Sequence, residues 1–228
     1  MKKILAVVAL AGLVTGVASA ALQANWAAPG VVTVNDAADD YLAGGSVGTD
    51  ILSLKCVYQD SGYYFLMTLQ AAPTPSAYAQ GYMINIDNAA GGAASANSYY
   101  IAQGLTGIDY IVDAHYDPFI NGGLGGYVVQ HEHEYIGGAA PQFDADVIPV
   151  NSIVFNTSVD GTQLEWFVPE ALVGGAGVNA FASTLNANPG GATFDTGSVL
   201  VTPVPEPTGM ALLALGVAAI GLRRKFRK

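Results

Sequence analysis

The sequence predicts an all-β body, a two-sheet antiparallel β-sandwich of the jelly-roll type that spans residues 21–203. No sustained hydrophobic period of 3.6 residues runs through this segment. Short apolar or alternating runs recur instead, separated by clusters of Gly, Asn, Asp and Pro. Apolar residues make up 51% of the chain and charged residues 11%, so there is ample material for a core.

A hairpin is the clearest local prediction. Residues 51–58 alternate, with Leu52, Leu54, Cys56 and Tyr58 on one face. A turn at residues 60–62 leads to residues 63–69, which are apolar on both faces, as a central strand would be. Further strands are predicted over residues 82–86, 108–114, 127–135, 153–157, 164–168, 178–184 and 198–202, with one helical turn at residues 169–172.

Charge separates the body from the two ends. Seven of the eight basic residues lie near a chain end. Between residues 21 and 204 the sequence contains one basic residue, Lys55, and 17 acidic residues. Duplex nucleic-acid binding needs clustered cations, so this body is not expected to bind nucleic acid. Anionic lipid head groups would also repel it.

The first 20 residues are predicted to form a signal helix for secretion. Lys2 and Lys3 precede an apolar run over residues 4–17. Ala18, Ser19 and Ala20 then give the small-x-small pattern of signal peptidase, which predicts a mature chain that starts at Ala21. The alternative is an uncleaved anchor helix.

Residues 204–228 form a second segment of distinct composition. Pro205, Glu206 and Pro207 separate it from the body, because two prolines interrupt regular structure. Residues 209–222 are apolar, shorter than the roughly 20 residues of a comfortable span, and snorkelling flanks would extend them. The predicted transmembrane helix ends in a basic tail that should stay in the cytoplasm and that begins with Arg223, Arg224 and Lys225.

This order of a Pro-Glu-Pro motif, an apolar helix and a basic end resembles the PEP-CTERM sorting signal of Gram-negative bacteria. The resemblance implies that an exosortase, a membrane transpeptidase, cleaves near residues 205–207. It further implies release or attachment at the cell envelope or in the extracellular matrix, in bacteria that typically make exopolysaccharide. A plain membrane anchor with a proline linker is the alternative.

The body contains, in order, an acidic patch at residues 36–40, a hairpin after it, and the segments 82–87, 107–110 and 164–172. This order resembles, more loosely, the sandwich shared by family 9 carbohydrate-binding modules and DOMON domains. The resemblance implies sugar binding or, in some DOMON members, haem binding, with calcium often supporting the fold.

Carboxylates suggest a hard cation as a possible cofactor. They cluster at residues 36–40, 109–117 and 144–146, and Asp87 ends a strand before a Gly-rich loop. Calcium takes six to eight oxygen ligands, and the body has almost no base to neutralise its acids. Asp36 and Asp87 are the predicted calcium ligands.

Histidines, cysteine and aromatic residues each allow two interpretations. His131 and His133 share a strand face and would bind a transition metal with a third ligand such as His115, or belong to a solvated strand. Cys56 is expected to be a buried, inert thiol, and a nucleophile is the alternative. The tyrosines either form sugar platforms or stabilise strands, and Trp26 is a platform candidate whereas Trp166 is expected in the core.

The sequence shows no nucleophile elbow, zinc-protease motif or phosphate-binding loop, so no catalytic residue is predicted. The leading hypothesis is an exported, non-catalytic glycan-binding protein that associates with exopolysaccharide. The alternatives are a purely structural surface or matrix protein without a small ligand, and a polysaccharide-modifying hydrolase.

Overall fold

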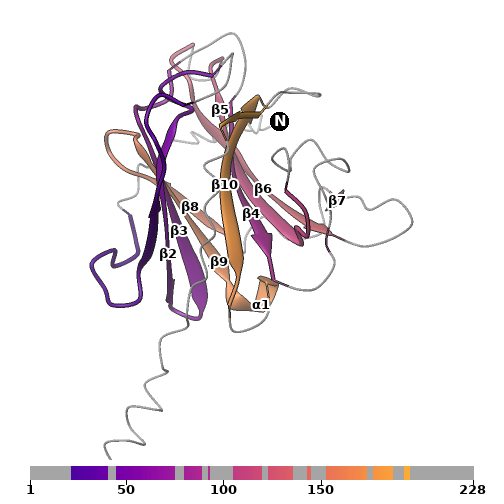
Figure 1. The fold of residues 1–228 in the computed structure, drawn as a ribbon. Coiled ribbons are helices and arrows are strands. Elements are labelled where there is room, and N and C mark those ends of the chain that lie inside the picture. Colours follow the sequence, from indigo (N-terminus) through magenta and orange to yellow (C-terminus); the bar gives the residue numbers. More distant parts are fainter. Residues whose placement is uncertain are drawn as a thin grey trace, which may run out of the picture.

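The computed structural model describes residues 22–40, 45–74, 80–88, 92, 105–119, 123–135, 143–144, 153–173, 177–186 and 193–195. Within them the chain forms two antiparallel β-sheets that face each other (Figure 1). This confirms the all-β prediction. The predicted signal helix at residues 1–20 and sorting helix at residues 209–222 lie outside the described residues. Over the residues described, no helix has both the length and the apolar character needed to cross a membrane.

Strand order shows how the chain passes between the two sheets. The five-stranded sheet has the order β1 (Val32–Asn35), β2 (Ile51–Gln59), β3 (Gly62–Leu69), β9 (Gln163–Pro169) and β8 (Val154–Thr157). The six-stranded sheet has the order β11 (Thr193–Asp195), β10 (Asn179–Asn186), β4 (Gln80–Asp87), β5 (Tyr110–Asp117), β6 (Gly126–Tyr135) and β7 (Phe143–Asp144). A single helical turn, α1 (Glu170–Val173), follows β9, as predicted from Pro169.

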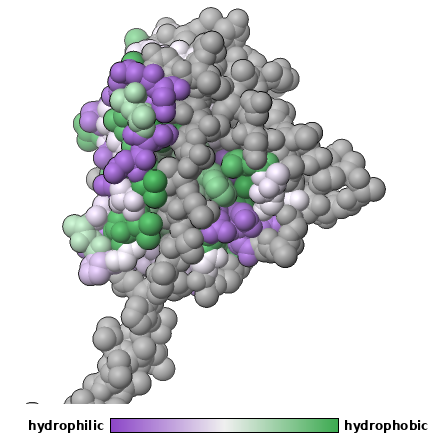
Figure 2. All heavy atoms as spheres, viewed as in Figure 1, coloured by the Kyte–Doolittle hydropathy of each residue, from purple (hydrophilic) through white to green (hydrophobic). Residues whose placement is uncertain are grey.

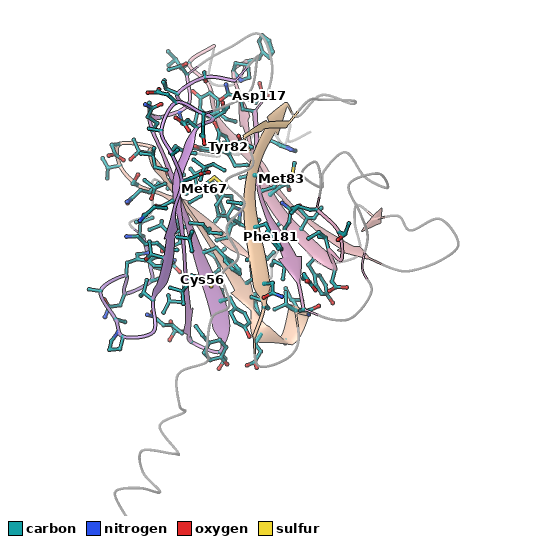
Figure 3. The ribbon with its side chains drawn as sticks, in the orientation of Figure 1. Cys56, Met67, Tyr82, Met83, Asp117 and Phe181 are labelled. Atoms are coloured by element: carbon teal, nitrogen blue, oxygen red, sulfur yellow. The ribbon has the colours of Figure 1, made fainter. Side chains whose placement is uncertain are left out.

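The hydrophobic core lies between the sheets. Alternate residues of each strand point into it, since successive side chains of a strand face opposite sides. The fully buried members include Leu54, Cys56, Phe65, Met67, Tyr82, Ile84, Ala114, Leu164 and Trp166. Figure 3 labels Cys56, Met67 and Tyr82 among them. Aromatic rings bridge the two layers, because Tyr82 contacts Tyr127 at 6.0 Å, Tyr127 contacts Phe155 at 5.3 Å and Phe155 contacts Trp166 at 5.1 Å between ring centroids.

The β2–β3 hairpin closes with a two-residue turn. Gln59 pairs with Gly62, and Asp60 and Ser61 between them have φ of 52° and 60°. Positive φ at both positions is typical of the type I′ turn, whose twist matches that of the flanking strands. The hairpin prediction is therefore confirmed, and β3 is the central strand of its sheet.

A β-bulge at the start of β2 corrects one detail of the predicted alternation. The register shifts between Ile51 and Ser53, so Leu52 is the extra residue. Ile51 consequently joins the core in place of Leu52, which is only partly buried. Alternation resumes from Leu54, and Cys56 and Tyr58 face the core as predicted.

Three short edge strands, β1, β7 and β11, were not predicted. Each has two to four residues, too few to show a period, and β1 alternates between partly buried and exposed positions. The strand predicted at residues 198–202 lies outside the described residues. On the side of the five-stranded sheet, Figure 2 shows hydrophilic and hydrophobic residues interspersed over the described surface.

Candidate functional site

An acidic cluster lies where β1 ends and β2 begins. Asp36 follows β1 directly, and its amide donates a 2.9 Å hydrogen bond to the carbonyl of Leu52. Asp50 precedes β2, and its Oδ2 accepts a 2.6 Å hydrogen bond from the amide of Asp39. Asp39 adopts φ of 64°, a left-handed conformation that aspartate tolerates better than most residues. The loop is thereby folded back over the Asp50 carboxylate.

The side chain of Asp50 is the least satisfied group of this cluster. Asp50 is 0% exposed, and its Oδ1 has no hydrogen-bond partner within the described part of the chain. Gln70 lies against it: the Gln70 amide donates to the Asp50 carbonyl at 2.9 Å, and Gln70 Nε2 donates to Asp39 Oδ1 at 2.9 Å. The Oε1 atom of Gln70 is likewise buried without a partner there.

Electrostatics within the cluster are repulsive. Burial raises the pKa of Asp50 above its ordinary value, and the negative charges of Asp40, Asp39 and Asp36 raise it further against the hydrogen bond from Asp39. The pKa of Asp36 is raised as well, first by burial and then by the charge of Asp40. The charges of Asp36, Asp39 and Asp40 thus all oppose the ionisation of Asp50.

The cluster is anchored to the opposite sheet. The Tyr82 hydroxyl donates a 2.8 Å hydrogen bond to the Gly48 carbonyl, and Thr184 Oγ1 donates one of 2.7 Å to the Thr49 carbonyl. Residues 48–50 are therefore fixed between the start of β4 and the far end of β10. A rigid base of this kind holds the Asp50 carboxylate in place.

Asp87, the other predicted calcium ligand, lies at the opposite end of β4. It is five residues beyond Tyr82, a distance of roughly 16 Å along a strand. Its local neighbour is another acid, since the amide of Asn88 donates a 2.9 Å hydrogen bond to Asp109 Oδ2. Asp36 and Asp87 therefore cannot bind the same ion.

The second candidate site involves β5 and β6. Asp113 is fully buried, and its Oδ2 lies 3.0 Å from Nε2 of His115. The register pairs His131 with Asp113 and His133 with Ile111. The side chains of these two histidines lie outside the described part of the structure, so their predicted role stays a prediction. Among the described residues, no three His, Cys, Asp or Glu side chains form a group that could hold a metal ion by themselves.

A third polar centre is the carboxylate of Glu165 on β9. It is fully buried and accepts hydrogen bonds from the amides of Gln23 at 2.7 Å and Ala24 at 3.2 Å. Trp26 Nε1 and Asn156 Nδ2 add bonds of 2.9 Å and 3.3 Å. Among the described residues, every hydrogen-bond partner of this carboxylate is a donor of the protein itself. The carboxylate therefore has a structural role, and it holds the Trp26 side chain in place.

The loop between β5 and β6 carries the most exposed described aromatic ring. Phe119 is 71% exposed, and its amide donates a 2.7 Å hydrogen bond to Oδ1 of Asp117 (Figure 3 labels Asp117). At the base of the loop the Tyr116 hydroxyl donates to the Leu124 carbonyl at 3.4 Å. The loop thus carries an exposed aromatic ring two residues along the chain from a partly exposed carboxylate.

The remaining candidates lie in the interior. Every tyrosine and tryptophan whose side chain is described is buried or partly buried, which favours the strand-stabilising interpretation. Trp166 and Cys56 are in the core, as predicted. Burial raises the pKa of the Cys56 thiol well above its ordinary value, so the reactive thiolate is suppressed.

Sequence reasoning found the acids at residues 36–40 but missed Asp50 and Gln70. An Asp directly before a strand and a Gln directly after the paired strand was the available signal. Their proximity follows from the β2–β3 register, in which Ile51 pairs with Leu69.

Comparison with known proteins identifies the C-terminal segment. Residues 203–225 match the PEP-CTERM protein-sorting motif. The chain therefore carries a PEP-CTERM sorting motif, which indicates exosortase-dependent sorting of an exported protein to the cell envelope. No curated protein and no solved structure matches the chain, so no relative informs the function of the body.

The predicted sorting and signal residues lie outside the described residues. They are Pro205–Pro207, Arg223–Lys225, and Ala18, Ala20 and Ala21.

Proposed function

We propose that this protein is exported by a Gram-negative bacterium, processed by signal peptidase before Ala21 and by an exosortase near residues 205–207, and displayed on the outer surface or in the matrix. Its body is a non-catalytic module that binds the exopolysaccharide of its own cell. The sorting motif at residues 203–225 supports the destination. The exposed aromatic ring of Phe119 in the β5–β6 loop is the observation that supports glycan binding.

An exposed ring beside a carboxylate suits a sugar. A pyranose has an apolar face of C–H groups that packs on an aromatic ring, while its hydroxyls need polar partners at the edge. Phe119 offers the ring, and Asp117 is a partly exposed acceptor two residues away. Of the aromatic side chains described, Phe119 is the one that solvent reaches over most of its surface.

A structural surface protein without a small ligand is the second candidate. The observation that favours it is the placement of the described tyrosines, all of which are buried or partly buried. Such a protein would act through its folded body and its attachment alone.

Affinity electrophoresis of the full, exported chain in gels that contain the producing organism's exopolysaccharide separates these functions. We expect retardation of the unaltered protein, weaker retardation of Phe119→Ala, and unchanged retardation of Val159→Ala, which removes an apolar side chain that is 93% exposed. No retardation of any variant would favour the structural function. Release of new reducing ends would favour a hydrolase.

Sorting is tested separately by mass spectrometry of the protein from its own host. We expect a mature chain that starts at Ala21 and ends near residues 205–207. A chain that retains the apolar segment 209–222 in cells with an active exosortase would overturn exosortase processing.

A further inference from the structure

We infer that the polysaccharide bound by the β5–β6 loop is cationic, a chain of amino sugars whose free amino groups carry a proton. This inference rests on the proposed glycan function and deepens it, because it names the chemical class of the ligand. Three observations carry it: the exposed ring of Phe119, the carboxylates at the same end of the sandwich, and the remote position of the basic residue Lys55.

The β5–β6 loop and the loop between β1 and β2 lie at the same end of the sandwich (Figure 1). Gln80 at the start of β4 pairs with Tyr116 near the end of β5, so β4 begins beside the base of the β5–β6 loop. From β4, the Tyr82 hydroxyl donates its 2.8 Å hydrogen bond to the Gly48 carbonyl in the loop before β2. The two loops therefore border one surface, and Figure 3 labels Asp117 at this end.

The turn between β8 and β9 belongs to the same end. The Leu69 amide donates a 2.8 Å hydrogen bond to the Thr162 carbonyl, and the Ala71 amide donates one of 3.0 Å to the Val47 carbonyl. These bonds join the β8–β9 turn and the β1–β2 loop to the segment that follows β3. Loops from three separate parts of the chain thus share one end of the sandwich.

Carboxylates that solvent reaches gather in these loops. The exposed or partly exposed acids that the structure describes there are Asp36, Asp39, Asp40, Asp117 and Asp160. Hydrogen bonds from Ser158 and Thr162 lower the pKa of Asp160, so this carboxylate stays ionised. The end of the sandwich that carries Phe119 therefore has a negative potential, which attracts cationic ligands.

The one Lys or Arg between residues 21 and 204, Lys55, lies away from this end. It is in the middle of β2, about 14 Å along the strand from Ile51, where β2 begins. His115, two residues before Asp117, is already engaged by Asp113, with 3.0 Å between Nε2 and Oδ2. A uronic acid or a sulfated sugar would thus bring its charge to carboxylates without a Lys or Arg to pair with.

A protonated amino sugar uses the ring and the carboxylate of the β5–β6 loop together. Its C–H face packs on the Phe119 ring as that of any pyranose does, and the face of an aromatic ring attracts an ammonium group. The Asp117 carboxylate is tied to the same residue, because its Oδ1 accepts the 2.7 Å hydrogen bond of the Phe119 amide. A carboxylate has further acceptor positions, and its hydrogen bond from an ammonium group is stronger than one between neutral groups. The loop should therefore bind an amino sugar more tightly than its neutral, N-acetylated counterpart.

Affinity electrophoresis of the full, exported chain in gels with matched polymers tests the class of ligand. Glycol chitosan supplies protonated amino groups, glycol chitin is the same polymer with these groups acetylated, and alginate is a polymer of uronic acids. A further gel contains the producing organism's exopolysaccharide. We expect the strongest retardation in glycol chitosan, an apparent affinity about tenfold weaker in glycol chitin, and none in alginate, because a hydrogen bond between charged groups accounts for a factor of this size.

Three variants separate recognition from attraction by bulk charge. Asp117→Asn keeps an Oδ1 acceptor for the Phe119 amide and removes the charge, so it should fold and bind glycol chitosan about tenfold more weakly. Phe119→Ala leaves the charge unchanged and should weaken binding about threefold to tenfold. Asp60→Asn is the matched control, because it removes the same charge from the β2–β3 turn at the opposite end, at φ of 52° that Asn also adopts. We expect it to bind as the unaltered protein does.

The outcomes are distinct. Retardation that prefers glycol chitosan, weakens in Asp117→Asn and Phe119→Ala and persists in Asp60→Asn supports an amino-sugar ligand. Equal retardation in glycol chitosan and glycol chitin overturns this class and leaves glycan binding in place, as does retardation by the native exopolysaccharide alone. A loss in Asp60→Asn as large as in Asp117→Asn also overturns the inference, because bulk charge then explains the retardation. No retardation in any gel overturns the proposed glycan function as well.

Discussion

Trp26 donates a hydrogen bond of 2.9 Å from its indole Nε1 to Oε2 of Glu165, which holds the segment around residue 26 against β9. The partners are 139 residues apart in sequence. The amides of Gln23 and Ala24 bind the same carboxylate. Residues that begin only two positions after the predicted cleavage site at Ala21 thus close over the outer face of the five-stranded sheet.

Replacing Glu165 with Gln should destabilise the protein by about 1–3 kcal/mol, the cost of leaving buried donors unsatisfied. A glutamine amide offers one acceptor oxygen in place of two. Its NH2 group would therefore face the donors at one end, either the Gln23 amide and Asn156 Nδ2 at Oε1 or the Ala24 amide and Trp26 Nε1 at Oε2. Urea unfolding followed by Trp fluorescence measures the change. Trp26→Phe keeps a ring and removes one donor, so its loss should be smaller; equal stability of both variants and the unaltered protein would contradict this role of Glu165.

The acidic cluster should make stability depend on pH. The folded-state pKa values of Asp50 and Asp36 are raised, so the native state holds these protons more tightly than the unfolded state does. Their contribution is favourable below the unfolded pKa of about 4 and is lost as the pH rises through the raised folded values. We therefore expect this part of the stability to fall as the pH rises from about 4 through the raised pKa values.

Asp50→Asn provides the control for this pH dependence. The variant has no proton to lose at residue 50, whereas the pKa of Asp36 stays raised by burial and by the charge of Asp40. Thermal melts from pH 4 to 7 should give a flatter profile than the unaltered protein. Asp160, whose pKa is lowered by hydrogen bonds from Ser158 and Thr162, acts in the opposite direction and loses its contribution as the pH falls. An unchanged profile in Asp50→Asn would exclude residue 50 as the source.

The part of this fold that could be predicted is the part that local sequence patterns, such as alternation and turn residues, indicate. The strand over residues 51–58 and its hairpin partner carry alternation and a turn, and both formed as predicted. Leu52 did not follow the pattern, because a bulge adds one residue to β2 and a bulge leaves no periodic mark in the sequence. The edge strand β1, with four residues, is too short for a period to be detected.

The candidate sites were predictable only to the extent that their residues are close in sequence. Asp36, Asp39 and Asp40 were found together because they are neighbours. Gln70 joins them through strand pairing, and Glu165 meets Trp26 across 139 residues, so register and topology, which emerge only on folding, decide both. For the same reason sequence reasoning favoured Asp87, whose strand-end position suits a ligand, although the fold places it far from Asp36.

The thiol of Cys56 should be protected by the core. It is fully buried and its pKa is raised by burial, so a thiol reagent can reach it as a reactive thiolate only when the structure opens. We expect modification by a disulfide reagent at a rate that tracks unfolding across a urea series. Rapid labelling of the native protein, at the rate of the urea-unfolded chain, would show that Cys56 is accessible.

The β5–β6 loop offers a matched pair of glycines that separates a steric clash from backbone strain. Gly125 and Gly123 both have positive φ, 77° and 89°, so alanine pays about 1–2 kcal/mol for the backbone at either position. At Gly125 a new Cβ would also lie 2.2 Å from the Tyr116 hydroxyl oxygen, whereas at Gly123 it meets nothing within 4 Å. Gly125→Ala should therefore cost about 1–3 kcal/mol more than Gly123→Ala in urea unfolding, because overpacking adds that amount. It should also displace the Tyr116 hydroxyl from the Leu124 carbonyl and so loosen the base of the loop that carries Phe119. Equal losses in the two variants would mean that Tyr116 moves aside freely and does not hold the loop.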